Sequence, residues 1–259
     1  MSLGIIDRLI PACGPRAGWL KHLGWRLRCP VCEARLPSFL PGGIDEPVLA
    51  ERRVIGGGRR PHAICPICGC PDRIRLLYLF LRNRTDLLAD MHRLLHVAPE
   101  PHLRACFLRM SDLHYVTADI DRPDVDLIMD LMRMPLADAC VDAVICSHVL
   151  EHVPDDRRAL SELFRVLRPG GWAILQVPIA ANGATYEDPS IICAEEQRMA
   201  FGQRGHVRLY GADFPDRLGE AGFTVEIFSW RSEPERYGGA QNVFGLIPQE
   251  NVFVARRSL

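Results

Sequence analysis

The sequence of 259 residues contains no apolar run as long as the roughly 18 residues that a membrane-spanning helix needs. A secretory signal pattern is missing as well, because Asp7, Arg8 and Pro11 interrupt the apolar residues at the start. Internal repeats and low-complexity tracts are also absent. We therefore expect a cytoplasmic globular protein, large enough for one sizeable domain and a smaller module.

Lysine is almost missing, since Lys21 is the only one among 31 basic residues. The arginine excess therefore indicates a general bias of the sequence and not a designed phosphate site. The formal net charge is -1, but residues 1–75 carry +6 and the remainder carries -7. A basic front module can bind an acidic substrate or pack on its own acidic domain, and charge alone does not decide between these.

Ten cysteines in a reducing compartment indicate metal binding or free thiols instead of disulfides. Two C-x-x-C pairs stand out, and each has proline after its first cysteine. Such pairs present thiolates to one tetrahedral zinc ion at about 2.3 Å, and four protein ligands leave no open position. We predict a structural zinc ribbon whose ligands are Cys29, Cys32, Cys65 and Cys68. Cys70 and His62 are alternate ligands. The alternative to a zinc site is four buried free thiols.

The stretch from Val141 to Pro178 is the most informative. VDAVICS is a short apolar run typical of a buried strand. Asp155 and Asp156 then begin a helical pattern whose apolar residues recur at helical spacing, with Arg165 and Arg168 expected in its last turn. Pro169-Gly-Gly ends the predicted helix and residues 172–177 form the next strand, so the unit is a parallel crossover.

Further elements follow from similar patterns. Trp19, Leu20, Leu23 and Leu27 fall on one face of a predicted short helix, which we expect to pack on the protein and not on a membrane surface. The patterns predict helices over 72–83 and 213–221 and an exposed loop over 231–249. They predict additional strands over 93–97, 114–118, 125–129, 223–229 and 250–255.

The run SHVLEHVPD, followed by RVLRPGG and a strand, resembles strands four and five of the class I S-adenosylmethionine-dependent methyltransferases. With its cysteine pairs, HVAPE loop and FGQ-x-x-HVR-x-YG segment, the chain resembles a narrower bacterial branch of that class. The resemblance implies an α/β doubly wound, mostly parallel sheet over 76–259 with an antiparallel edge, preceded by the zinc module over 1–75. It also implies that S-adenosylmethionine is the cofactor.

The loop after the first strand departs from the general pattern of the class. His96 stands where an acidic residue is usual, and Ala98, Glu100 and His102 stand where glycines are usual. The resemblance to the narrower branch implies that this loop is an accepted variant. Ala98 still permits close approach of the backbone, and Glu100 is our candidate for binding the methionine ammonium group, with Val97 and Pro99 beside them.

Other cofactor-binding residues are also implied by the resemblance. Asp119 follows the second strand, 23 residues after His96, where an acid holds the ribose hydroxyls, and Asp121 is the alternative. Asp130 faces the adenine amino group, and Leu131 stacks on the ring. Ser147 and His148 end the fourth strand at the cofactor edge of the sheet. We interpret the following Glu151 and His152 as mainly architectural.

The polar stretch from Ala180 to Arg208 is too long for a simple connection, and we expect it to cover the substrate. His206 is the candidate general base, because histidine accepts a proton near neutral pH. Glu187 and Asp188 are second candidates, and Arg208 is a candidate for pairing with an acidic substrate group. Alternatively, His206 and Arg208 bind this loop to the acidic segment of Glu187 and Asp188.

We predict methyl transfer to oxygen or nitrogen of a small-molecule or sugar acceptor. One alternative is an RNA methyltransferase that docks through the basic zinc module, although nucleic-acid motifs are lacking. Another is a binding or scaffold protein that has lost the chemistry, suggested by the altered loop. A nicotinamide-dependent dehydrogenase is disfavoured because G-x-G-x-x-G is absent. The sequence leaves the oligomeric state open.

Overall fold

The computed structural model describes residues 24–84, 88, 91 and 93–259. The predicted short helix around Trp19, Leu20 and Leu23 lies outside these residues. Among the described residues, no helix is long and apolar enough to cross a membrane.

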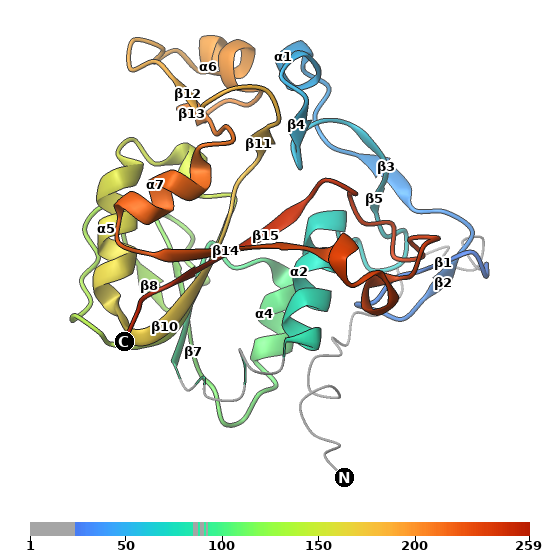
Figure 1. Cartoon of the computed structure of the whole chain (residues 1–259), viewed down its shortest axis with the longest axis horizontal. Coiled ribbons are helices and arrows are strands. Elements are labelled where there is room, and N and C mark those ends of the chain that lie inside the picture. Colours follow the sequence, from blue (N-terminus) through green and yellow to red (C-terminus); the bar gives the residue numbers. More distant parts are fainter. Residues whose placement is uncertain (1–23, 85–87, 89–90, 92) are drawn as a thin grey trace.

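A seven-stranded sheet in the order β14-β15-β10-β9-β6-β7-β8 forms the centre of the structure (Figure 1). The strands β6 to β10 pair in parallel, whereas β15 is antiparallel to both β10 and β14. This topology confirms the predicted doubly wound sheet with an antiparallel edge. The third predicted strand is shorter than expected. The strands span Arg93–Val97 (β6), His114–Asp119 (β7), Leu127–Ile128 (β8), Val141–Ser147 (β9), Leu167–Gln176 (β10), Thr224–Ser229 (β14) and Asn251–Arg256 (β15).

The crossover helix α5 spans Asp156–Val166 and begins where the sequence indicated. Asp155 caps it by accepting a hydrogen bond from the Arg158 main chain at 2.9 Å. Its end was predicted wrongly, because β10 already begins at Leu167 and Arg168 lies in that strand. Leu167 pairs with Val141 of β9 before a bulge, so sheet pairing ends the helix earlier than the Pro-Gly-Gly turn does.

Helices cover both faces of the sheet, as neighbouring strand residues indicate. Leu94 packs on the side of α2 (Asp72–Asn83) and α4 (Pro101–Phe107), together with Ile145 and Ile174. Leu95 packs on the opposite side, with α5 and α7 (Phe214–Glu220). Figure 1 shows these two helical layers flanking the strands. Successive side chains along each strand point to opposite faces of the sheet, and both faces are buried, as is usual for a parallel sheet.

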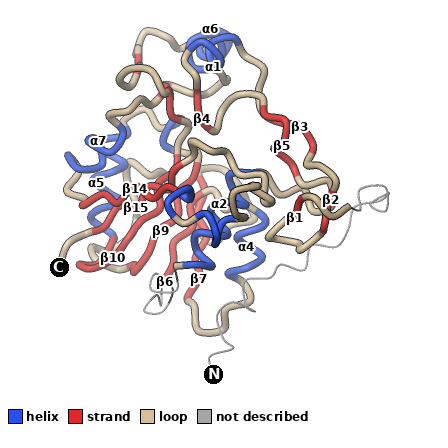
Figure 2. The backbone as a smooth tube through the Cα atoms, turned by 45° about the vertical axis from the view of Figure 1, so that its right-hand side comes forward, coloured by secondary structure: helices blue, strands red, loops and turns tan. Residues whose placement is uncertain are grey.

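The front module forms small antiparallel pairs around the cysteines. Its strands are Leu27–Arg28 (β1), Arg35–Leu36 (β2), Leu40–Gly42 (β3), Val54–Ile55 (β4) and Arg60–Ile64 (β5), and its helix is Pro47–Glu51 (α1). β4 leaves the module and pairs with β11 (Ile179–Ala180), just after strand β10. Figure 2 shows α1 beside α6 (Ala194–Phe201), which belongs to the long insertion. The insertion also contains Tyr186–Glu187 (β12) and Arg208–Leu209 (β13).

The predicted domain division at residue 75 falls inside α2 and stays a prediction. Arg75 is fully buried in that helix. Its guanidinium donates hydrogen bonds to the main-chain oxygens of five residues on both sides of the division: His62, Ala63, Cys70, Phe244 and Gly245. One side chain therefore connects the module to the segment before β15.

That segment was predicted as an exposed loop, and the structure shows only part of it exposed. It contains two short 3-10 helices, Trp230–Ser232 (η4) and Pro234–Tyr237 (η5), and the side chains of Trp230, Tyr237 and Leu246 are buried. Arg28 donates a main-chain hydrogen bond to the Val243 oxygen at 2.8 Å, so the loop packs on the front module. Gly245 packs closely in this segment, since a Cβ there would lie 2.6 Å from the Phe39 ring.

Glu250 is buried at the start of β15, and its Oε2 atom has no hydrogen-bond partner among the described residues. Burial raises the pKa of Glu250 to about 7. Because the folded state favours the neutral carboxyl, its contribution to stability is complete below about pH 4.5 and is lost as the pH rises through about 7. We therefore predict that Glu250→Gln becomes more stable relative to wild type between pH 5 and pH 8, by up to roughly 3 kcal/mol.

Urea unfolding at both pH values measures this difference. Exposed Glu235→Gln is the matched control, which we expect to follow wild type at both pH values. A stability difference between Glu250→Gln and wild type that does not change with pH would contradict the buried, neutral state of this carboxyl.

Candidate functional site

A pocket lies at the carboxyl ends of β6, β7 and β8. It collects five of the nine residues predicted to bind the cofactor: Val97, Ala98, Asp119, Asp130 and Leu131. Further lining comes from residues after β9, including Val149, His152 and Val153. Parallel strands present ligand sites at this edge because their loops gather there. We call this space the first pocket.

Ala98 keeps the backbone conformation that a glycine would adopt in this loop. Its φ is +47°, in the left-handed region, which costs an L-residue roughly 1–2 kcal/mol. The Ala98 main chain donates to the Ala118 oxygen at 2.7 Å, which ties the turn to the neighbouring strand. The unusual loop thus retains the tight turn even though its sequence lacks glycine.

Glu100, Pro99 and Ser147 lie next to the first pocket without lining it. The Glu100 carboxylate contacts His96 Nε2 at 2.7 Å, and His96 Nδ1 hydrogen-bonds the Tyr115 hydroxyl at 2.9 Å. Burial raises the pKa of Glu100, but hydrogen bonds from His96 and Ser147 and the charge on His96 outweigh burial and lower it. Glu100 is therefore held as a carboxylate by the residue that replaces the usual acid on the first strand.

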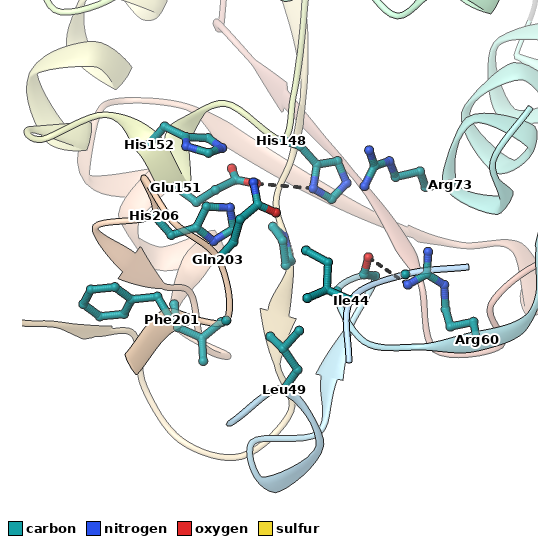
Figure 3. A pocket seen from close by; sticks show the side chains of 16 residues that line it. Ile44, Leu49, Arg60, Arg73, His148, Glu151, His152, Phe201, Gln203 and His206 are labelled. Atoms are coloured by element: carbon teal, nitrogen blue, oxygen red, sulfur yellow. Dashed lines mark hydrogen bonds and ion pairs between the residues drawn. The ribbon is translucent and has the colours of Figure 1, made fainter. Parts of the chain in front are cut away.

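A second pocket lies between the sheet and the front module (Figure 3). His148, Glu151, His152 and His206 line one side of it. The front module supplies the opposite side through α1, β5, the segments that follow β3 and β4, and the start of α2: Gly43, Ile44, Leu49, Gly56, Gly57, Arg60 and Arg73. His152 lines both pockets, so this side chain borders the two spaces.

Glu151 is 2% exposed and faces the second pocket. One carboxylate oxygen lies 3.3 Å from His148 Nδ1, whereas the other, Oε2, has no hydrogen-bond partner among the described residues. Burial raises the pKa of Glu151, but the hydrogen bond and charge of His148, helped by His206, lower it overall. His148 has a φ of +58°, and its main chain donates to the Gln176 oxygen at 2.8 Å, which fixes this turn.

His206, the predicted base, lies on the wall of the second pocket and is 7% exposed. Burial lowers its pKa to about 4, although the nearby Glu151 carboxylate opposes this shift. The His206 ring is therefore neutral at pH 7. It stacks edge-to-face on the His152 ring with 4.5 Å between centroids.

Arg208 is 3% exposed and holds the main chain of the turn that carries Glu151 and His152. Its guanidinium donates to the carbonyl oxygens of Leu150 (2.9 Å), Val153 and Pro154 (2.8 Å). It also pairs with Glu187 at 3.0 Å. For Arg208, this ion pair agrees with the alternative interpretation, in which it binds the loop to the acidic segment, and the substrate contact stays a prediction.

Neither acidic candidate lines the second pocket. Glu187 pairs with Arg208 and with Arg217, at 2.8 Å to the latter. The exposed Asp188 carboxylate accepts hydrogen bonds from Ser190. Because these carboxylates are engaged elsewhere, the geometry does not support them as bases.

The four predicted zinc ligands lie together. The Sγ atoms of Cys29, Cys32, Cys65 and Cys68 all fall within 4.8 Å of one another, with two of the separations at 3.8 Å. Their chemistry and closeness fit one tetrahedral zinc ion. The alternate Cys70 thiol donates to the Pro71 oxygen instead, and neither it nor His62 belongs to the cluster.

Sequence reasoning missed two parts of the second pocket. Glu151 and His152 were interpreted as mainly architectural, yet both line it. Their position just past the carboxyl end of β9 was the available signal, because ligand sites gather there. Arg60 and Arg73 of the front module had no such signal, since only the folded chain brings the module beside the sheet.

Comparisons with known proteins agree with this architecture. Residues 105–175 match the model of a methyltransferase domain. A protein of Mycolicibacterium smegmatis named "Probable S-adenosylmethionine-dependent methyltransferase" is 31% identical over 147 residues, 54% of this chain and 48% of the relative. The 27-O-demethylrifamycin SV methyltransferase of Amycolatopsis mediterranei is 30% identical over 141 residues, 51% of this chain and 50% of the relative. The predicted resemblance to S-adenosylmethionine-dependent methyltransferases is thus confirmed.

The chain spans about half the length of these two curated relatives. Among solved structures, a S-adenosylmethionine-dependent methyltransferase from Archaeoglobus fulgidus has 16% identity and a TM-score of 0.43, covering 70% of this chain and 92% of that one. That score is below the level at which superposition supports an argument.

We predict that Arg208→Gln lowers the free energy of unfolding by about 3 kcal/mol, because it leaves a buried network without its cation. Thermal or urea unfolding measures this, with exposed Arg204→Gln as the control expected to stay within about 0.5 kcal/mol. If Arg208→Gln is as stable as wild type yet loses activity, Arg208 contacts substrate instead.

Proposed function

We propose that this chain, which carries a methyltransferase domain over residues 105–175, transfers the methyl group of S-adenosylmethionine to a small-molecule or sugar acceptor. The observation that carries the proposal is that one side chain, His152, lines both pockets. The first pocket is the donor site and the second is the acceptor site. Methyl transfer needs two such sites in contact, because the acceptor atom must approach the donor carbon directly.

In the donor site, Asp119 binds the ribose hydroxyls, Asp130 binds the adenine amino group and Leu131 packs on the ring. Asp119 is nearly buried at the end of β7, and its side chain also accepts from the Asp121 main chain at 3.3 Å. The left-handed turn at Ala98 lets the backbone approach the cofactor. Glu100, held ionised by His96, supplies negative charge near the methionine end together with Ser147 and His148 at the strand edge.

The acceptor forms its new bond to the methyl carbon, and the electron pair of the broken carbon–sulfur bond leaves with sulfur as a neutral thioether. The cofactor supplies an already activated methyl group, so positioning and exclusion of water supply most of the catalysis. An oxygen or protonated nitrogen acceptor must also lose a proton. We propose that His206 receives it, which is supported by its neutral ring at pH 7 and its place in the wall of the acceptor site.

Two features support a small acceptor. The acceptor site lies between the front module and the sheet, with Phe201 and Leu49 on its wall beside the polar groups. Two relatives are named for small-molecule acceptors, a demethylmenaquinone methyltransferase of Renibacterium salmoninarum and the 27-O-demethylrifamycin SV methyltransferase. We propose that the front module shapes this site and does not serve as an RNA dock. The cytoplasmic location stays a prediction.

We further propose that Cys29, Cys32, Cys65 and Cys68 hold a structural zinc ion. Its role is to fix the front module, whose cysteines belong to the same hydrophobic core as α2 and the sheet. Since β4 of that module pairs with β11 next to the acceptor site, order in the module determines the shape of that site.

The donor site is tested with S-adenosylhomocysteine, the demethylated product. We predict one binding site per chain by calorimetry and roughly tenfold or weaker binding by Asp119→Asn, because a charged acceptor of ribose hydrogen bonds is lost. The nearby exposed Asp121→Asn is the matched control, which we expect to bind as wild type. Full binding by Asp119→Asn and weak binding by Asp121→Asn would move the ribose contact to Asp121.

The zinc site is tested by metal analysis after gel filtration with a chelator. We expect one zinc per chain in wild type and in Cys193→Ser, whose thiol is exposed and distant from the cluster. Cys65→Ser should lose the ion and unfold at lower temperature, because three thiolates bind zinc less tightly than four. Zinc-free wild type with full thermal stability would contradict a structural ion.

A further inference from the structure

A second group of metal-binding side chains lies in the acceptor site. One ligand atom from each of Glu151, His152 and His206 lies within 4.8 Å of the others. The group is separate from the four cysteines of the zinc module. Two imidazoles and a carboxylate are the donor set of catalytic zinc and related divalent ions, which keep a position open for substrate.

An independent observation points to a missing ligand at this place. Glu151 is 98% buried, and its Oε2 atom has no hydrogen-bond partner among the residues that the structure describes. Leaving a buried carboxylate oxygen unpaired is costly, so such an atom in a pocket wall requires a partner. The neighbouring His152 and His206 rings, when neutral, have lone pairs that can bind a metal ion, but they carry no positive charge to balance the Glu151 carboxylate.

The surrounding hydrogen bonds orient the three side chains as metal ligands are usually oriented. His152 Nδ1 donates to the Gly205 oxygen at 3.1 Å, which leaves its Nε2 lone pair free. His206 hydrogen-bonds the main chain of Phe201. His148 Nδ1 contacts the other Glu151 oxygen, Oε1, at 3.3 Å. Outer partners of this kind fix the tautomer and direction of ligating groups.

We propose that Glu151, His152 and His206 bind a divalent transition-metal ion, of the zinc or cobalt type, with an open coordination position that faces the acceptor site. Because His152 also lines the donor site, the open position lies where the two sites meet. Figure 3 shows these three side chains gathered on one wall, with Arg60 and Arg73 across the pocket.

The use of this ion rests on the proposed function. An acceptor hydroxyl bound at the open position loses its proton to solvent, and the resulting oxygen anion forms the bond to the methyl carbon while sulfur keeps the electron pair. With the ion bound, His206 is a metal ligand and not the general base. The proton of the acceptor hydroxyl therefore passes to solvent and not to the His206 ring. A bound oxygen acceptor is thereby favoured over nitrogen, since the ion lowers the pKa of a coordinated hydroxyl.

The test titrates Co²⁺ into full-length protein that carries its cysteine-bound zinc. We expect one added Co²⁺ per chain, with weak visible ligand-field bands and no thiolate charge-transfer band. His206→Asn and His152→Asn should weaken Co²⁺ binding at least about 100-fold, because removing a ligand costs no less than removing an outer partner. His152 is exposed, so His152→Asn keeps the test valid if buried His206→Asn fails to fold.

Exposed His114→Asn is the matched control, which should bind Co²⁺ as wild type does. Absence of an added Co²⁺ in wild type, or its full retention in both His206→Asn and His152→Asn, would overturn the metal site. S-adenosylhomocysteine binding by the same samples is a separate readout. Failure of the wild-type protein to bind S-adenosylhomocysteine contradicts the proposed function. Failure to bind Co²⁺ alone contradicts only the metal site.

Discussion

One buried guanidinium holds the turn on which the two pockets depend. Arg208 donates hydrogen bonds to three main-chain carbonyl oxygens in the turn after β9, those of Leu150, Val153 and Pro154. Leu150 and Val153 are buried, and hydrogen bonds from a charged donor contribute roughly 1.5–3 kcal/mol each. The same turn carries Glu151 and His152, so their side chains face the pockets because Arg208 fixes the backbone between them. A second main-chain bond, from Val207 to the Glu151 oxygen at 2.9 Å, joins the insertion to this turn.

The front module contributes to the site through packing more than through charge. β4 extends the module onto β11, and Leu49 packs with Phe201 and Leu209 of the insertion. Arg75 joins the same module to the segment before β15. The acceptor site therefore has walls from three distant parts of the chain. We propose that the cysteine cluster affects methyl transfer by holding one of these walls in place.

The sequence predicted the sheet well and the acceptor site only in part. Buried strands such as Val141–Ser147 and the capped start of α5 follow from local patterns, which is why their bounds were accurate. Asp119, Asp130 and Leu131 were proposed from the resemblance to methyltransferases, and all three line the first pocket because the loops after parallel strands gather at one edge of the sheet. Arg208 was predicted as a substrate contact. The sequence alone does not distinguish an arginine that binds a ligand from one that binds backbone carbonyls. The role of Gly56 and Arg73 in the pocket depends on long-range packing of the module, for which no local pattern exists.

The central claim is that the donor and acceptor sites meet at His152. A crystal structure of the protein with S-adenosylhomocysteine tests this most directly. We expect the adenine ring to pack against Leu131, the ribose to bind Asp119, and the sulfur atom to point at the opening beside His152. A ligand bound elsewhere, or one whose sulfur points away from His152, would contradict the claim that these two pockets form one methyl-transfer site.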